Sequence, residues 1–215
     1  MKKFVFIVSL CSLVVAGCTA KVTTSTTPAP TNTAPAKTSS PTASTSAPKT
    51  EKKAPSTNPV PSDWIRLHDD AKGYEFMVPQ GTQDKSQTVD NVDVYLASVP
   101  APYEIGVIVV AFKDKSLTKD DLLKRAENIL KSLDEKDIKI EPAKELNEDY
   151  SLATFTSTGK DGKAGKGKIL VATDVTDNYI MLVGGDAEKF AANEKTIDEI
   201  WGSFGMYSGG ASGNS

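Results

Sequence analysis

The 215-residue chain has very few of the side chains that most often carry catalysis or hold metals. It contains two cysteines, Cys11 and Cys18, and one histidine, His68. Both cysteines precede Thr19, so the rest of the chain has no thiol for a disulfide, a zinc site or a nucleophile. The G-x-S-x-G pattern of serine hydrolases is also missing. The sequence therefore predicts no catalytic residue, no metal and no cofactor, and we expect a protein that is not an enzyme.

Positive charge is scarce in most of the chain. Residues 19–62 carry five lysines and one glutamate, but the residues after position 62 carry 18 basic and 27 acidic side chains. An acidic surface is repelled by phosphate backbones. We therefore expect no nucleic-acid partner.

The first 17 residues have the layout of a secretory signal peptide. Lys2 and Lys3 form a positive segment, and the apolar stretch 4–16 is shorter than the ~20 residues of a membrane-spanning helix. The stretch ends in Val15-Ala16-Gly17-Cys18, which resembles the lipobox of bacterial lipoproteins. The resemblance implies cleavage before Cys18 and attachment of a lipid such as palmitate to its thiol.

A lipid on Cys18 would make the chain an exported cell-envelope protein whose membrane contact is that lipid. In bacteria with two membranes, an Asp after the lipidated cysteine often retains a lipoprotein at the inner membrane. Thr19 stands there in this chain, which favours the outer membrane in such a host. In a bacterium with one membrane, the same signal predicts the outer face of the cell membrane.

Residues 18–62 are predicted to form a disordered tether that begins at the lipidated Cys18. Thr, Ser, Pro and Ala fill 34 of the 44 positions from 19 to 62. Such a segment buries too little apolar surface to offset the entropy lost on ordering. Pro-rich chains are extended, so the tether would hold the following domain away from the membrane. Ser/Thr/Pro tracts are also typical acceptors of O-glycosylation.

Residues 63–206 are predicted to form one α+β domain, and 207–215 a disordered tail. Thr118 and Asp121 form a pattern like a capping box, which predicts a helix from there to Leu133. Asp186 is expected to cap a final helix. Its apolar face comprises Phe190, Ile197, Ile200, Trp201 and Phe204. Strands are expected at 64–68, 74–78, 92–96, 105–112, 138–140, 150–157, 168–175 and 179–183. This order predicts a mostly antiparallel sheet with helices packed on it.

Two segments resemble PsbP-like domains. Gly73-Tyr74-Glu75-Phe76-Met77-Val78-Pro79 is similar to their opening strand, and the pattern I-x-x-I-W-x-S-F at 197–204 is similar to their last helix. The resemblance covers residues 64–206, although Gln80-Gly81 departs from the Gly-Trp that often follows the proline. Photosystem II extrinsic proteins, a Ran-binding transport factor and DcrB-related bacterial lipoproteins have this fold. It implies an α/β/α sandwich with a role in binding or assembly.

Four lysines are expected around one hairpin tip, and they are the candidate contact patch: Lys160, Lys163, Lys166 and Lys168. The simplest interpretation is a mobile tip, and the alternative is a patch that contacts a lipid headgroup, a wall anion or an acidic partner. Replacement of all four by Ser is expected to leave folding intact. The stretch 162–168 also matches G-x-x-x-x-G-K, but Ile169 replaces the Mg²⁺-binding Ser or Thr, so we expect no nucleotide.

Other candidate residues are expected to be structural. His68-Asp69-Asp70 lies at a predicted turn, where carboxylates usually bond to their own backbone. Tyr103 lies in a predicted hairpin loop, from which it could contact a partner. Four aromatic residues at strand or helix spacing are expected in the core rather than around a ligand: Trp64, Tyr74, Tyr179 and Trp201.

These observations predict a membrane-anchored envelope lipoprotein whose domain binds a protein or cell-wall partner without catalysis. The alternative is a lipoprotein that binds a small molecule or a lipid. A deep apolar pocket between sheet and helix would favour a ligand. A solid core with an exposed apolar patch would favour a protein partner.

Overall fold

The computed structural model describes residues 51–55, 58–89, 92–174 and 177–207. The leader, Cys18, the tether up to residue 50 and residues 208–215 lie outside the described residues. The described elements belong to one compact unit, Pro48–Ser215. The strands are β1 (Glu51–Lys53), β2 (Ile65–Asp69), β3 (Tyr74–Val78), β4 (Gln83–Val89), β5 (Val92–Val99), β6 (Ile105–Phe112), β7 (Lys136–Ile140), β8 (Lys144–Glu145), β9 (Tyr150–Thr158), β10 (Ala164–Thr173), β11 (Asn178–Asp186) and β12 (Gly205–Tyr207). The helices are α1 (Lys119–Ser132), α2 (Ala187–Ala192) and α3 (Glu194–Gly202).

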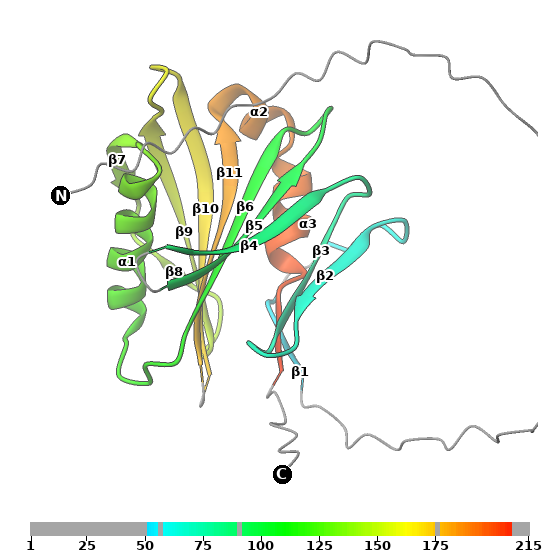
Figure 1. Cartoon of the computed structure of the whole chain (residues 1–215), viewed down its shortest axis with the longest axis vertical. Helices are drawn as coiled ribbons and strands as arrows, with labels where there is room; N and C mark the ends of the chain where they lie inside the picture. Colours follow the sequence, from blue (N-terminus) through cyan, green and yellow to red (C-terminus); the bar gives the residue numbers. More distant parts are fainter. Residues whose placement is uncertain (1–50, 56–57, 90–91, 175–176, 208–215) are drawn as a thin grey trace, which may run out of the picture. The chain divides into compact units, whose positions relative to one another are not determined.

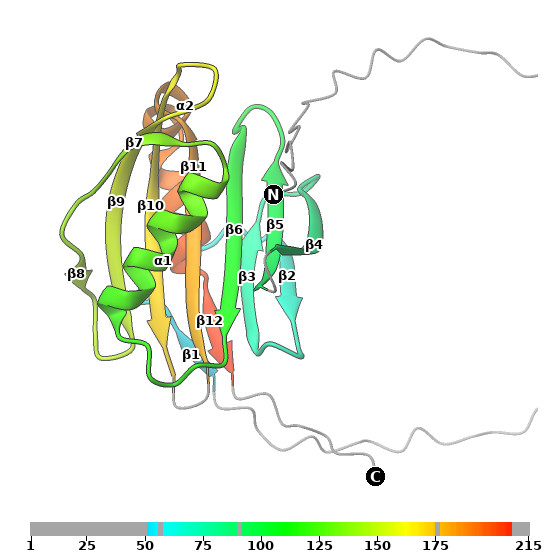
Figure 2. The ribbon, with the colours of Figure 1, turned by 60° about the vertical axis from the view of Figure 1, so that its left-hand side comes forward.

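The strands form two antiparallel sheets. The larger sheet has the order β4-β5-β6-β11-β10-β9-β7, with β8 paired to β9, and the smaller sheet has the order β1-β12-β3-β2. Helix α1 covers one face of the larger sheet, and the smaller sheet lies with α2 and α3 on the other face (Figures 1 and 2). The α+β class predicted from the sequence is therefore confirmed. None of the helices in the described ranges is long and apolar enough to cross a bilayer.

Each face of the larger sheet has its own hydrophobic core. On one face, Leu122, Ala126 and Leu130 of α1 pack on β9, β10 and β11. On the other face, the strands pack against α3 and the smaller sheet, and an aromatic cluster fills the space between them. In that cluster Tyr74 stacks on Phe204 with 6.1 Å between ring centroids. Strand β6, predicted to be covered on both faces, contributes side chains to both cores.

Strand β1 lies within the range predicted as tether, so the folded part of the chain begins before Asp63. It pairs with β12, and Ala54, just after it, is buried in the core. The Ala54 N–H donates to the Phe204 carbonyl at 2.8 Å. At the other end of the chain, Tyr207 belongs to β12 and is buried, although the predicted tail begins there. Neither end was predicted because both strands are very short and their pairing partners, β12 for β1 and β3 for β12, are distant in sequence.

The final helix is divided in two at Asn193. Asp186 precedes α2 but makes no side-chain capping bond, contrary to the prediction. Asn193 has a non-helical backbone, with φ −125° and ψ 22°. Its side-chain amide donates to the Lys189 carbonyl at 2.9 Å and to the Tyr103 carbonyl at 3.3 Å. These bonds compete with helix continuation. The five apolar side chains predicted for this segment are nevertheless all buried.

Candidate functional site

The four lysines of the predicted contact patch do not form one open surface. Lys160 is exposed at the hairpin tip, where Lys163 pairs with Asp161 and Asp186 at 3.4 Å each. Strand β10 begins at Ala164, before the predicted start at Lys168, so Lys166 lies in the strand instead of the loop and Lys168 lies further inside it. The Lys166 ammonium lies 4.8 Å from the centre of the Phe190 ring. The predicted patch is therefore divided: Lys160 and Lys163 lie at the hairpin tip, and Lys166 and Lys168 lie in β10.

Lys168 is largely enclosed, with only 12% of its side chain exposed. Its ammonium bonds to the Asp198 carboxylate of α3, and the Trp201 indole N–H donates to the same carboxylate at 2.8 Å. Lys168 therefore joins β10 to α3. Substitution of all four lysines is no longer expected to leave folding intact.

The resemblance of this segment to a phosphate loop has a structural explanation. Gly167 lies inside β10, opposite Phe155 of β9 and Gly184 of β11. A Cβ atom at Gly167 would lie 2.4 Å from the Phe155 ring and 2.7 Å from the Val183 carbonyl. The glycine is therefore required by the close approach of its neighbours and does not form a cradle for phosphate.

The other candidate residues have structural positions. His68 is exposed on edge strand β2, with Nε2 3.9 Å from Asp70. Tyr103 is half-buried and packs against the core. Tyr74, Tyr179 and Trp201 are buried, and Trp64 packs against the same core, as predicted. In the described residues, no group of three His, Cys, Asp or Glu side chains could hold a metal ion.

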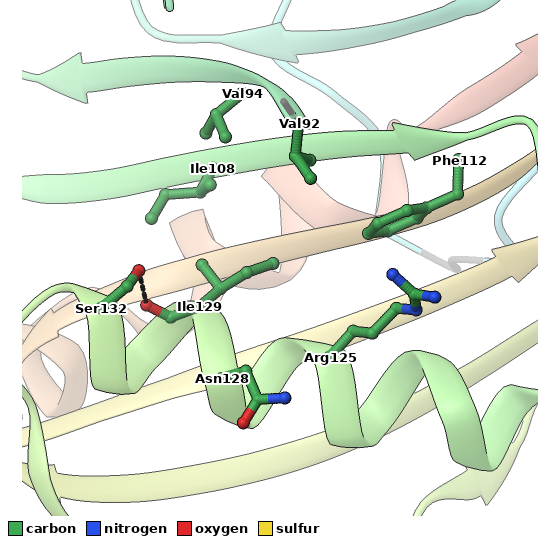
Figure 3. Close-up of a pocket in the computed structure, with 8 residues that line it drawn as sticks. All are labelled: Val92, Val94, Ile108, Phe112, Arg125, Asn128, Ile129 and Ser132. Carbon is green, nitrogen blue, oxygen red and sulfur yellow. Dashed lines mark hydrogen bonds between the residues drawn. The ribbon is translucent and has the colours of Figure 1, made fainter. Parts of the chain in front are cut away.

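An apolar groove lies between helix α1 and strands β5 and β6 (Figure 3). It has a volume of about 230 Å³ and is open to solvent along one side. Its lining comprises Val92, Val94, Ile108, Phe112, Arg125, Asn128, Ile129 and Ser132. It is the strongest candidate site in the described part of the chain, because most other large apolar side chains there are buried.

The groove arises because the larger sheet is wider than the helix that covers it. Helix α1 contacts β7, β10 and β11, whereas β4 and β5 continue the sheet beyond it. Val92 and Val94 alternate with Asp93 along β5, so the two valines share the face on the helix side. On β6, Ile108 and Phe112 lie on that face and adjoin the α1 core. On this strip Val94 is buried, whereas Val92, Ile108 and Phe112 remain partly exposed.

One stripe of α1 forms the opposite wall. Arg125, Asn128, Ile129 and Ser132 follow the spacing of residues on one helix side, next to the inward-facing Leu122, Ala126 and Leu130. The helix starts at Thr118 with the predicted capping box, in which Thr118 Oγ1 accepts from the Asp121 N–H at 3.2 Å. The capping box and the apolar spacing that determine where α1 lies therefore also determine the position of this stripe.

Arg125 is the only charged residue in the lining. Its guanidinium carbon lies 5.0 Å from the centre of the Phe112 ring, a distance typical of a cation–π contact. No hydrogen bond or ion pair joins this guanidinium to another described residue, although Asp114 and Asp121 are near enough to feel its charge. Arg125 is therefore held in place at one end of the groove while its N–H donors remain available.

The nearby carboxylates have partners of their own. Asp114 accepts from the Ser116 hydroxyl at 2.6 Å, and this bond is the main reason why its pKa is lowered. Asp121 accepts from the Thr118 hydroxyl at 2.7 Å, which likewise lowers its pKa. A second, charged depression adjoins the groove and shares Val92, Phe112 and Arg125 with it. Its other lining residues are Lys72, Asp93, Ala111, Lys113, Asp114 and Asp177.

The sequence predicted several elements of this site but not the site itself. Val92 and Val94 were expected on a half-buried strand, and Ile129 on the inner side of the helix. Arg125 was not singled out, because it lies at the boundary between the inner and outer helix faces. A groove of this kind depends on where the helix crosses the sheet, and no local pattern encodes that position.

The groove lining contains no carboxylate, imidazole or thiol. Its apolar floor and single cation suit the binding of an apolar group more than the transfer of a proton or acyl group. No family model matches the chain, and no curated protein sequence matches it.

Several solved structures are similar to this chain at low identity. Cyanobacterial PsbP from Synechocystis has 16% identity and a TM-score of 0.49, over 68% of this chain and 94% of that chain. The Ran-binding protein Mog1p from Saccharomyces cerevisiae has 11% identity and a TM-score of 0.46, over 66% and 94% respectively. LpqN, a Mycobacterium tuberculosis protein involved in cell envelope biogenesis, has 17% identity and a TM-score of 0.37, over 73% and 83%.

Proposed function

We propose that the chain is a lipid-anchored cell-envelope protein whose α+β domain is a binding module without catalytic activity. The groove beside α1 is the proposed binding surface. The observation that carries this proposal is the apolar groove beside α1, in which Val92, Ile108 and Phe112 are only partly buried. Occupation of the groove would remove this apolar surface from water and so favour binding.

The lipid anchor is the second part of the proposal. It is supported by the Val15-Ala16-Gly17-Cys18 pattern after a short apolar leader, and it would place the domain in the cell envelope. A Cys18→Ser variant of the full chain is expected to lose incorporation of a labelled fatty acid in growing cells. Label that persists in the variant would exclude Cys18 as the lipidated residue.

The binding surface can be tested with a photo-crosslinking amino acid in the full chain in intact cells. Asn128 is exposed and lines the groove, whereas Lys124 lies on the outer side of the same helix with 76% of its side chain exposed. The proposal expects an adduct, identified by mass spectrometry, from position 128 and not from position 124. Equal labelling from both positions, or none from either, would contradict it.

An apolar small molecule or lipid is a second candidate for what the module binds, next to a protein or wall partner. It is favoured by the apolar lining of the groove and by its position between sheet and helix, where a deep apolar pocket would favour a ligand. The adduct at position 128 separates these candidates, because a protein partner adds the mass of a polypeptide and a lipid adds much less.

A further inference from the structure

We propose that the groove binds a single alkyl chain with an anionic head group, and that Arg125 holds the head. This inference rests on the proposed role of the groove as the binding surface and names the chemical class of its occupant. The apolar wall would contact the alkyl chain, and the guanidinium at the end of the groove would bond to a carboxylate or a phosphate.

Arg125 provides the charge complementarity. Phe112 supports the guanidinium from one side, at 5.0 Å, and so limits its motion. The carboxylates that feel its charge are bonded elsewhere, Asp114 to Ser116 and Asp121 to Thr118. An anion at the groove could therefore form two parallel N–H···O bonds with the planar guanidinium, the geometry that favours arginine at such sites.

The floor of the groove favours an alkyl chain over an extended peptide. Strand β5 is paired to β4 and β6, and β6 is paired to β5 and β11, so the backbone groups of both strands are engaged within the sheet. A peptide strand laid on this floor would find few partners for its own N–H and C=O groups. An alkyl chain has no polar group to satisfy there.

The size of the groove also suits a chain instead of a helix. From Arg125 to Ser132 the axis of α1 rises by about 10 Å. A second helix with its side chains is about as wide as this whole length, and a volume of about 230 Å³ holds only a slender apolar segment. Asn128 and Ser132 are the uncharged polar residues along the open side.

Three probes of equal chain length test the head group: decanoate, decyl phosphate and decan-1-ol. The full chain is used for calorimetry and for NMR of its methyl groups. Decanoate or decyl phosphate is expected to shift the methyl signals of Val92, Val94, Ile108 and Ile129. Both should bind about tenfold or more tightly than decan-1-ol, because charge-assisted bonds to Arg125 add to the apolar contact.

Two variants make the result specific. Arg125→Gln keeps a good helix former and is expected to bring decanoate to the affinity of decan-1-ol. Asn128→Trp should obstruct the groove and weaken all three probes, whereas Lys124→Trp on the outer side of α1 should weaken none. Unchanged thermal unfolding of each variant would show that the domain remains folded.

The outcomes separate this inference from the proposed function. Equal affinities for acid and alcohol, or unchanged decanoate binding in Arg125→Gln, would overturn the anionic head group but leave the groove as a binding surface. Binding of none of the probes, together with a polypeptide adduct at position 128, would replace the alkyl chain by a protein partner. A preference for decanoate over decyl phosphate would indicate a free fatty acid, and the reverse a phospholipid with a single chain.

Discussion

The Lys52 ammonium lies 3.0 Å from the carboxylate of Asp149, although 97 residues separate the two in the chain. The same ammonium lies 3.2 Å from Asp174. Nearby, the Tyr150 hydroxyl donates to the Lys52 carbonyl at 2.7 Å. Strand β1 is therefore held both through its backbone pairing with β12 and through a lysine that bridges two loops of the larger sheet.

The Lys52 ion pairs are expected to contribute modestly to stability. Lys52→Met should lower the free energy of unfolding by about 1 kcal/mol or less, because 36% of the lysine side chain is exposed and water screens its charge. Urea unfolding at neutral pH measures the difference. Lys124→Met, at a lysine that is 76% exposed, is the control and should change little.

The same pairs predict a pH dependence. The hydrogen bond to Asp149 is the largest cause that raises the pKa of Lys52 in the folded state. Because this pKa is raised, the ion pairs of Lys52 stabilise the fold fully at a pH below the unfolded-state pKa of about 10.4. This stabilisation is lost as the pH rises through the folded-state pKa. The difference in the free energy of unfolding between the wild type and Lys52→Met should thus stay constant from neutral pH to about pH 10 and shrink above it. A difference that disappears below about pH 9 would contradict the assignment.

Removal of β1 is expected to destabilise the domain far more than loss of Lys52 alone. A chain that starts at residue 56 lacks the ladder to β12 and the buried Ala54, and leaves the buried Tyr150 hydroxyl without its carbonyl partner. An unsatisfied buried hydroxyl costs about 1–3 kcal/mol by itself. The urea midpoint should fall clearly relative to a chain that starts at residue 48. Equal midpoints would show that β1 is not part of the stable fold.

Among the four lysines, Lys168 is predicted to matter for stability. Lys168→Met removes the cation that faces Asp198 in a largely enclosed position, and it should cost about 1–3 kcal/mol. Lys160→Met, at the exposed hairpin tip, should stay within about 0.5 kcal/mol of the wild type. Thermal unfolding of the two variants distinguishes a structural lysine from a surface one. The same loss in both would contradict the separation of the patch.

Gly167 in β10 and Gly106 in β6 are two glycines of the larger sheet that differ in the space around them. A Cβ at Gly167 would lie 2.4 Å from the Phe155 ring, whereas a Cβ at Gly106 would meet its nearest atom, the Gly184 carbonyl oxygen, at 3.6 Å. Gly167→Ala should therefore cost about 1–3 kcal/mol through overpacking, and Gly106→Ala should be nearly neutral. Stability curves of the two alanine variants measure this contrast, and equal losses would refute the packing explanation.

Local signals explain which parts of the fold the sequence predicts. The Thr118–Asp121 capping box marks the start of α1 within a few residues, alternation marks β5, and the Gly/Lys loop marks the hairpin of β9 and β10. Strand β4 was not predicted, because it is a polar edge strand with no apolar alternation. The division at Asn193 was not predicted either, since one of its two side-chain bonds reaches Tyr103, which is distant in sequence.

The candidate site was less predictable than the fold. The four lysines were predicted to form a patch because they are close in sequence. In the structure, however, Lys166 contacts α2 and Lys168 contacts α3. The groove instead combines residues of β5, β6 and α1 whose individual patterns indicate only ordinary half-buried positions. Its existence depends on the sheet being wider than its helix, which is a property of the assembled layers.

The pairing of Glu51 with Tyr207 places the first and last described strands side by side at one end of the domain (Figure 1). A pulling force that is applied at residue 51 therefore acts on β1 and its partner β12 before it acts on either hydrophobic core. The short β1–β12 ladder and the two ion pairs of Lys52 would bear that load first. Under tension, the domain would yield by release of β1, while the groove on the opposite face of the larger sheet keeps its shape.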